Sequence, residues 1–169
     1  GEFVFFVDAD DFIENNALNL LVENYNQYKA DIIVGDFNNI RNDNSAPSHS
    51  GIFSSNRLLT KQDIVNYVRS YLTKPNRYSL FVYSWGRLLK SSIIKNNNIR
   101  FDTSLHTFED VAFNFDYLNY TNGILFLKEP IYNHLVRDNY TSTSMIITSN
   151  PKSLFGYKQA LLNISDFLN

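Results

Sequence analysis

The chain has 169 residues, of which 44% are hydrophobic and 15% aromatic, and it carries 15 basic against 17 acidic side chains. This length suits one compact domain, and the apolar content can fill a core, which excludes a wholly disordered chain. A net charge of −2 gives no overall field to hold a polyanion, so we expect no nucleic-acid partner. The absence of cysteine excludes disulfides, thiolate metal sites and a cysteine nucleophile. No apolar run is long enough to cross a bilayer.

The beginning of the chain predicts a strand, a helix and a second strand. A continuous run of aromatic and β-branched residues at 3–7 is typical of a strand buried on both faces. A helix capped by Asn15 or Asn16 follows, and residues 30–35 then form a second buried strand. This succession predicts a mainly parallel sheet.

The middle of the chain alternates polar and apolar segments. The cluster of Asn, Ser, Asp, Pro and Gly at 38–56 predicts a loop. Thr60 caps a helix that Pro75 closes. Residues 78–94 predict a helix or a mixed segment, and a short strand at 99–101 follows.

The last third of the chain predicts two helices separated by strands. Helical spacing marks residues 109–120, and two short strands at 124–127 and 131–136 are joined across Pro130. A final amphipathic helix begins near Pro151. Its expected buried stripe consists of apolar residues at helical spacing, namely Leu154, Tyr157, Leu161, Leu162 and Phe167.

Three carboxylates, Asp8, Asp10 and Asp11, directly follow the first strand. In an open α/β sheet, ligands bind at the carboxyl ends of strands. The three charges repel one another, so their folding together is costly unless a cation or hydrogen-bond donors compensate. Mg²⁺ or Mn²⁺ would do so and leave coordination positions for substrate phosphates. The alternative is a solvated acidic turn, but such a turn does not need the buried strand that precedes it.

The residues around this cluster discriminate between two kinds of metal-dependent protein. An EF-hand loop counted from Asp8 needs Gly and Glu where the chain has Ile13 and Leu20, so it is excluded. A haloacid-dehalogenase-like phosphatase also has a hydrophobic strand that runs into Asp-x-Asp. Such an enzyme would have Thr or Val at position 12 and Ser or Thr at the end of the second strand, but this chain has Phe12 and Asp36 there.

A more specific signal comes from four segments in a fixed order. They are Gly1–Asp11, Ser84–Lys90, Asn97–Phe101 with Phe108–Val111, and Ile131–His134 with Tyr140–Ser144. Together they resemble the family 2 glycosyltransferases of the GT-A fold, in particular bacterial enzymes that build capsular, lipopolysaccharide or teichoic-acid glycans. The likeness spans residues 1–145, and Leu89 departs from it because the family commonly has Tyr there.

The resemblance implies an α/β fold, a truncated GT-A (nucleotide-diphospho-sugar transferase) fold with a mixed, mainly parallel sheet flanked by helices. Residues 1–150 would form the metal, diphosphate and acceptor sides of the catalytic domain. Residues 151–169 would be a C-terminal helix that packs on it or leads to a further region. Since the family carries its nucleoside-binding strands before the first matching segment, we expect this chain to be a C-terminal portion that lacks them and is inactive alone.

The resemblance also implies residues of the donor side. Asp10 matches the direct ligand of the metal, Mg²⁺ or Mn²⁺, and Asp8 would contact the metal or the ribose. Asp11 would support the site or cap the next helix. His134 and Arg137 would reach the donor diphosphate, although a lone histidine on a strand is more often structural.

On the acceptor side, Asp110 matches the base that takes the proton from the attacking hydroxyl in an inverting transfer. Glu109 would orient the acceptor or the base. Two acidic residues here also complement the dipole of a helix that begins at this point. Trp85 would stack on a sugar or fill the core, and His106 would line the acceptor site.

These implications define an expected function. The parent enzyme would transfer a sugar from a nucleotide-sugar donor to a glycan or lipid-linked acceptor in bacterial surface polysaccharide synthesis. We expect it in the cytoplasm, with peripheral association at the inner face of the membrane left open. Two alternatives also stay open. A phosphatase would use Asp8 as nucleophile, Asp10 as acid and base, and Glu109 with Asp110 as magnesium ligands, whereas a sugar- or nucleotide-binding domain would have no turnover.

Overall fold

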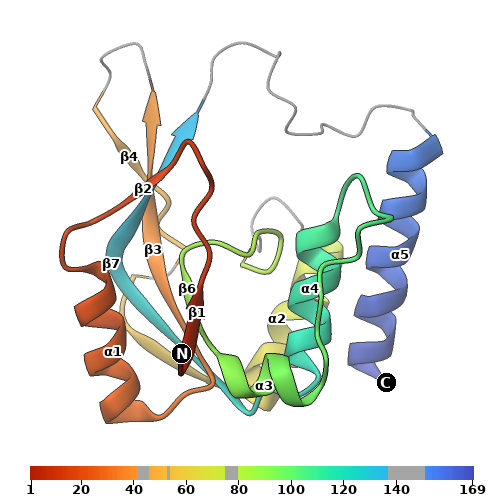
Figure 1. Ribbon diagram of the computed structural model, residues 1–169, viewed down its shortest axis with the longest axis horizontal. Coiled ribbons are helices and arrows are strands. Elements are labelled where there is room, and N and C mark those ends of the chain that lie inside the picture. Colours follow the sequence, from red (N-terminus) through yellow and green to blue (C-terminus); the bar gives the residue numbers. More distant parts are fainter. Residues whose placement is uncertain (42–45, 53, 75–79, 137–150) are drawn as a thin grey trace.

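The computed structural model describes residues 1–41, 46–52, 54–74, 80–136 and 151–169. The strands are β1 (Phe3–Phe5), β2 (Phe12–Ile13), β3 (Ile32–Arg41), β4 (Ser48–His49), β5 (Arg57–Thr60), β6 (Arg87–Lys90) and β7 (Gly123–Val136). The helices are α1 (Ala17–Tyr28), α2 (Lys61–Thr73), α3 (Ser91–Asn96), α4 (Glu109–Leu118) and α5 (Pro151–Leu168). One seven-stranded sheet carries α1 on one side and α2, α3 and α4 on the other, and α5 lies outside α4 (Figure 1).

The sheet is mixed, with the strand order β1-β6-β3-β7-β2, while β4 pairs with β3 and β5 with β7. Of the six pairings among described strands, only β3 with β7 is parallel. The expectation of a mainly parallel sheet is therefore wrong. The sheet differs from this expectation because of β6, which lies within the segment that was expected to be a helix or a mixed segment. This strand inserts antiparallel between β1 and β3, so the strand-helix-strand unit at the start of the chain does not form neighbouring strands.

The central pair of strands is longer than the sequence suggested. β7 is one continuous strand instead of two, because Pro130 falls opposite Asp36 at an irregularity in the ladder where its missing N–H is tolerated. β3 extends to Arg41, and β4 also forms inside the segment expected to be loop. Residues 99–101 form no strand.

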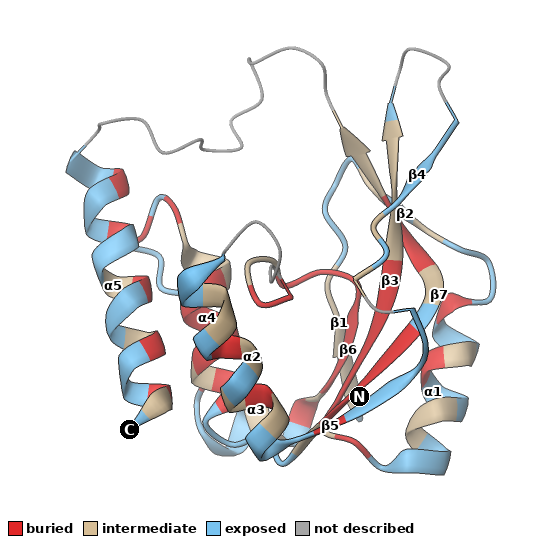
Figure 2. Ribbon diagram, turned by 180° about the vertical axis from the view of Figure 1, so that it is seen from behind, coloured by how far each residue is buried: buried red, intermediate tan, exposed pale blue. Residues whose placement is uncertain are grey.

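Alternate residues of the central strands face two separate cores. Ile32 and Val34 pack with α2, α4 and α5, whereas Ile33 packs with Ala17 and Leu21 of α1. Most of the buried strand residues belong to β3, β6 and β7, which lie between the two helical layers (Figure 2). This arrangement explains why the strand segments lack polar alternation.

β1 covers only Phe3–Phe5 of the expected run 3–7 and is partly buried, and Val7 is 46% exposed, so the prediction of a strand buried on both faces is wrong there.

The helix starts follow the sequence to different degrees. Thr60 and Asp63 form a reciprocal capping box at α2, as the sequence predicted for Thr60. Asn16 precedes α1, but its side chain makes no capping hydrogen bond. The helix α2 ends at Thr73, and the predicted closing residue Pro75 lies outside the described residues.

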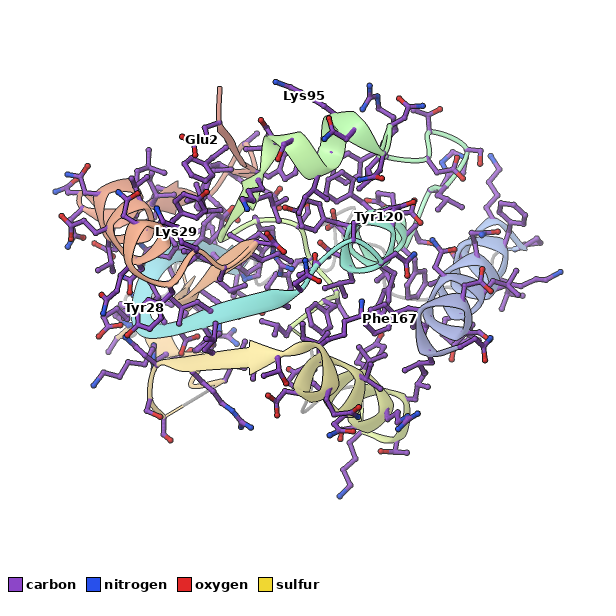
Figure 3. The ribbon with its side chains drawn as sticks, turned by 90° about the horizontal axis from the view of Figure 1, so that it is seen from below. Glu2, Tyr28, Lys29, Lys95, Tyr120 and Phe167 are labelled. Carbon is purple, nitrogen blue, oxygen red and sulfur yellow. The ribbon has the colours of Figure 1, made fainter. Side chains whose placement is uncertain are left out.

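The buried face of α5 differs from the expected stripe. Leu154, Tyr157, Leu161 and Leu162 are between 39% and 55% exposed, and only Phe167 of the predicted set is buried. The residues that face α4 are Ser153, Gly156, Ala160, Ile164 and Phe167. The small residues Ser153, Gly156 and Ala160 lie on this face, and their size lets the helix pack closely against the rest of the fold. Phe167 points toward α4 and α2 (Figure 3), where it meets Phe115 and Lys61.

No helix within the described ranges is both long and apolar enough to span a membrane.

The close approach of α5 predicts the effect of Gly156→Ala. A Cβ at Gly156 would overlap the carbonyl oxygen of Thr107 and lie 2.7 Å from its Oγ1. Alanine adds about 1 kcal/mol of helix propensity, but overpacking against backbone typically costs about 1–3 kcal/mol. We expect net destabilisation in urea unfolding. The control Ser165→Ala, at an exposed position of the same helix, is expected to leave stability unchanged or raise it, and equal stabilisation by both variants would contradict this packing.

Candidate functional site

The acidic turn (residues 8–11), which joins β1 to β2, is tied to β7. The backbone N–H of Asp8 donates to the Tyr132 hydroxyl at 3.0 Å, and that hydroxyl donates to Asp11 Oδ2 at 2.8 Å. Asp11 Oδ1 accepts from the backbone N–H of Leu135 at 2.8 Å. The Asp11 carboxylate is therefore engaged with the protein on both oxygens, which agrees with the supporting role expected for it.

The electrostatic environment of Asp8 is strongly acidic. The pKa of Asp8 is raised above its ordinary value by the partial removal of water, and then by the charges of Asp11, Asp110 and Asp10. His134 acts in the opposite direction and lowers it. The acidic turn and the Glu-Asp pair, about a hundred residues apart in sequence, therefore contribute carboxylates to one region.

The start of α4 presents Glu109 and Asp110. Phe108, at the cap, has a left-handed backbone with φ 64°, which is unusual for a bulky residue and fixes the direction in which the helix begins. The Ser84 hydroxyl donates to Asp110 Oδ1 at 2.6 Å. Glu109 Oε2 is buried and has no hydrogen-bond partner among the described residues. A small pocket opens here, lined by Val82, Thr107, Phe108, Glu109, Asp110 and Val111.

The segment that presents Ser84, here the Ser84 loop (residues 80–86), is held by two buried side chains, Arg87 and Asn114. The accepting carbonyl groups are those of Leu80 and Trp85 for Arg87, at 2.7 and 3.3 Å, and those of Phe81 and Tyr83 for Asn114, both at 3.0 Å. Burial lowers the pKa of Arg87 to about 10, while Tyr83 and Asp110 act in the opposite direction and raise it. Buried polar side chains thus give an irregular loop a defined shape.

Trp85 is the centre of an aromatic stack and is only 7% exposed. Its ring is nearly parallel to those of Tyr83 and Tyr132, at centroid distances of 4.0 and 4.4 Å. Two rings this close on one face would overlap each other, so they cover opposite faces. His134 also stacks on Trp85, at 5.5 Å, and its Nδ1 lies 3.1 Å from Asn39 Oδ1. The geometry favours the core-filling interpretation of Trp85 over stacking on a sugar.

The remaining predicted site residues are either exposed or outside the described residues. His106 is exposed in the turn before α4, and Asp10 is exposed in the acidic turn. Arg137 and the Ser/Thr-rich segment 140–144 lie outside the described residues.

Sequence reasoning missed four residues that organise this region. Ser84, Arg87 and Tyr132 lie inside the segments that carry the family resemblance, but nothing in their local pattern marks them as buried polar groups. Asn114 lies in a helix, where it resembles any other polar position. Only a helical-wheel argument could have found it, since it follows Asp110 by four residues and so shares its face.

The site fits a divalent metal in its chemistry. Carboxylate oxygens are the ligands that Mg²⁺ and Mn²⁺ prefer, and the raised pKa of Asp8 reports a region that a cation would stabilise. Among the described residues, no group of three His, Asp or Glu side chains is gathered closely enough to hold a metal by itself. One or two carboxylates from Asp8 and Asp10 suit an ion that also binds substrate phosphates.

The comparisons with known proteins find glycosyltransferases. The chain is 25% identical over 138 residues to the glycosyltransferase GlyA of Streptococcus pneumoniae, and this alignment covers 81% of this chain and 19% of GlyA. It is 26% identical over 150 residues to the poly(ribitol-phosphate) β-N-acetylglucosaminyltransferase TarP of Staphylococcus aureus, which covers 89% of this chain and 42% of TarP. These relatives are glycosyltransferases. No family model matches the chain.

The structural comparison supports the fold. The S. aureus TarS structure of residues 1–349 in complex with UDP-GlcNAc matches with a TM-score of 0.71 and 18% identity, over 99% of this chain and 47% of that one. This likeness confirms the expected α/β, truncated GT-A-like fold with its mixed sheet and flanking helices. The chain spans less than half the length of these glycosyltransferases. The likenesses do not favour the phosphatase alternative.

The electrostatics of Asp8 predict how stability depends on pH. Because its pKa in the folded state lies above 3.8, its ionisation lowers stability above that raised pKa, and the penalty vanishes below the ordinary value. We expect Asp8→Asn to raise the midpoint of thermal unfolding slightly at pH 7, since solvent screens the exposed carboxylate, and to leave it unchanged at pH 3.

A control of opposite sign is Asp63, whose pKa is lowered by hydrogen bonds from Thr60. Asp63→Ala is expected to lower the unfolding midpoint at pH 7, with a loss that shrinks as the pH falls through the lowered pKa. If Asp8→Asn destabilised the protein at pH 7 as Asp63→Ala does, the carboxylates near Asp8 would not be repelling one another.

Proposed function

We propose that this chain carries the metal, diphosphate and acceptor sides of a family 2 glycosyltransferase site. The whole protein would transfer a hexose-type sugar from a nucleotide-diphosphate donor to a glycan or lipid-linked acceptor hydroxyl, with inversion, in bacterial surface polysaccharide synthesis. The observation that carries the proposal is the electrostatic contact between two distant elements. Burial raises the pKa of Asp8, and the charges of Asp11 and then Asp110 raise it further, so Asp110, held by Ser84 at the start of α4, lies near enough to the acidic turn to act on its charge. A cytoplasmic location is part of the proposal, and peripheral association with the inner face of the membrane stays open.

On the donor side, Asp8 and Asp10 would hold Mg²⁺ or Mn²⁺ together with the donor diphosphate. A bound metal supplies Lewis-acid stabilisation of the charge that develops on the departing nucleotide. Asp11 holds the turn in place through Tyr132 and Leu135. His134 lies near Asp8 and would add positive charge toward the diphosphate when protonated, and Arg137 is proposed for the same role.

On the acceptor side, Asp110 would accept the proton of the attacking hydroxyl. The hydrogen bond from Ser84 to Oδ1 orients the carboxylate, and Oδ2 would accept the proton. Glu109 has a buried oxygen without a described partner beside the same pocket, so it can accept a hydrogen bond from an acceptor hydroxyl. His106, exposed in the preceding turn, would line the outer part of this subsite, whereas Trp85 contributes packing.

Asp110→Asn tests the proposed base. The relatives suggest UDP-GlcNAc as the first donor to try, since TarS was crystallised with it. In the full-length protein with Mn²⁺, we expect the variant to lose about 10²–10⁴-fold in kcat, measured as UDP release with acceptor, while donor binding is retained. Asp116→Asn, a carboxylate farther along the same helix, is the matched control. Wild-type turnover by Asp110→Asn would overturn the assignment of the base.

Ser84→Ala tests the support of Asp110. Loss of a hydrogen bond to a carboxylate is expected to lower kcat on the order of tenfold, because the base is then less well oriented. The control is Ser91→Ala, which removes an equally buried hydroxyl whose 2.6 Å hydrogen bond goes to the carbonyl of Gly1 instead. Equal losses in the two variants would indicate a general effect on stability and contradict the proposed role of Ser84.

A further inference from the structure

Tyr132 lies at the junction between the two halves of the proposed site. It belongs to β7, it is fully buried, and its hydroxyl and its ring contact different elements. Its partners are the acidic turn on one side and Trp85 of the Ser84 loop on the other. A single side chain thus touches the segment with the proposed metal ligands and the segment that supports the proposed base.

The hydroxyl makes two hydrogen bonds with complementary polarity. It accepts from the backbone N–H of Asp8 at 3.0 Å and donates to Asp11 Oδ2 at 2.8 Å. Because a backbone N–H can only donate and the Asp11 carboxylate accepts, these two partners fix the direction in which the hydroxyl donates. The turn is therefore pinned at its first and last carboxylate residues by one oxygen atom.

The ring provides the second connection. It lies 4.4 Å from Trp85 at an interplanar angle of 10°, and Trp85 lies 4.0 Å from Tyr83 at 9°. Tyr83 directly precedes Ser84, whose hydroxyl holds Asp110. Three stacked rings in a packed interior resist compression and sliding, so they transmit the position of β7 to the Ser84 loop.

Transfer between a metal-held donor and an acceptor requires the proton-accepting group and the metal ligands to stay at a fixed separation, since errors near 1 Å are costly. We propose that Tyr132 is a positioning residue that sets this separation, with its hydroxyl ordering the acidic turn and its ring ordering the Ser84 loop. The inference rests on the proposed function, and it assigns a role to a residue that touches neither donor nor acceptor.

Tyr132→Phe tests the inference because it removes the hydroxyl and keeps the stacked ring. The matched control is Tyr117→Phe, which removes a similarly buried hydroxyl that donates to the carbonyl groups of Asp31 at 3.0 Å and Lys90 at 3.3 Å, on other elements. Two readouts are taken on the full-length protein. One is amide hydrogen exchange of residues 8–11 without metal, and the other is Mn²⁺ affinity by calorimetry.

We expect Tyr132→Phe to lose protection at the Asp8 amide and to bind Mn²⁺ about tenfold more weakly, while Tyr117→Phe matches the wild type in both. Unchanged exchange at Asp8 and unchanged Mn²⁺ affinity in Tyr132→Phe would overturn the positioning role. If Tyr132→Phe does not fold, Asp11→Ala removes the acceptor of the Tyr132 hydroxyl, and amide exchange at Asp8 is then the only readout, because this variant also changes the charge near the proposed metal ligands. Unchanged exchange at Asp8 would again overturn the positioning role.

The two proposals fail in different ways. A wild-type protein that binds no Mn²⁺ and releases no UDP from UDP-GlcNAc or other nucleotide sugars would overturn the proposed function, and the positioning role with it. A wild-type protein that binds Mn²⁺ and transfers sugar, beside a Tyr132→Phe variant that does both equally well, would overturn the positioning role alone.

Discussion

The parallel pairing of β3 with β7 is the constraint on which the rest of the structure depends. It runs from Ile32 opposite Ile124 to Arg41 opposite Val136, and it crosses an irregularity at Asp36 and Pro130. Every other strand joins this pair directly or through one neighbour. Beyond the irregularity, the Tyr132 hydroxyl and the backbone N–H of Leu135, both on β7, donate to the Asp11 carboxylate of the acidic turn. The same ladder that builds the two cores therefore fixes the donor side of the proposed site.

The candidate site brings several carboxylates together, and hydrogen-bond donors of the protein compensate for part of their negative charge. Asp11 is satisfied by two donors, and Ser84 satisfies one oxygen of Asp110. The Asp8 carboxylate keeps a raised pKa, and Glu109 keeps a buried oxygen without a described partner. Incomplete satisfaction of this kind, beside a strained cap at Phe108, is typical of binding and catalytic sites, which retain unfavourable features that a ligand relieves.

The sequence predicted several elements well and others poorly, for identifiable reasons. Strong local signals were confirmed, namely a strand at Phe3–Phe5, the capped helix at Thr60 and the helix that begins with Glu109 and Asp110, although the first strand is shorter and less buried than predicted. The prediction of which face of α5 is buried was wrong, because hydrophobicity alone favours Leu154 and Leu161, whereas close packing against Thr107 requires Gly156. The strand β6 was missed because an aromatic-rich segment gives no clear period.

The sequence by itself determined which kinds of side chain form the candidate site. Carboxylates after a hydrophobic strand predicted a metal site, because they are a local pattern with a defined chemical meaning, and the order of four segments resembled that of glycosyltransferases. Only the tertiary structure decided how these groups are held. Ser84, Asn114 and Tyr132 act through partners distant in the chain, Arg87 needs burial to hold the nearby loop, and the packing of Trp85 depends on rings from the Ser84 loop and from β7. A buried polar contact has no signature in local sequence, since its stability comes from the exclusion of water by elements that meet only in the folded protein.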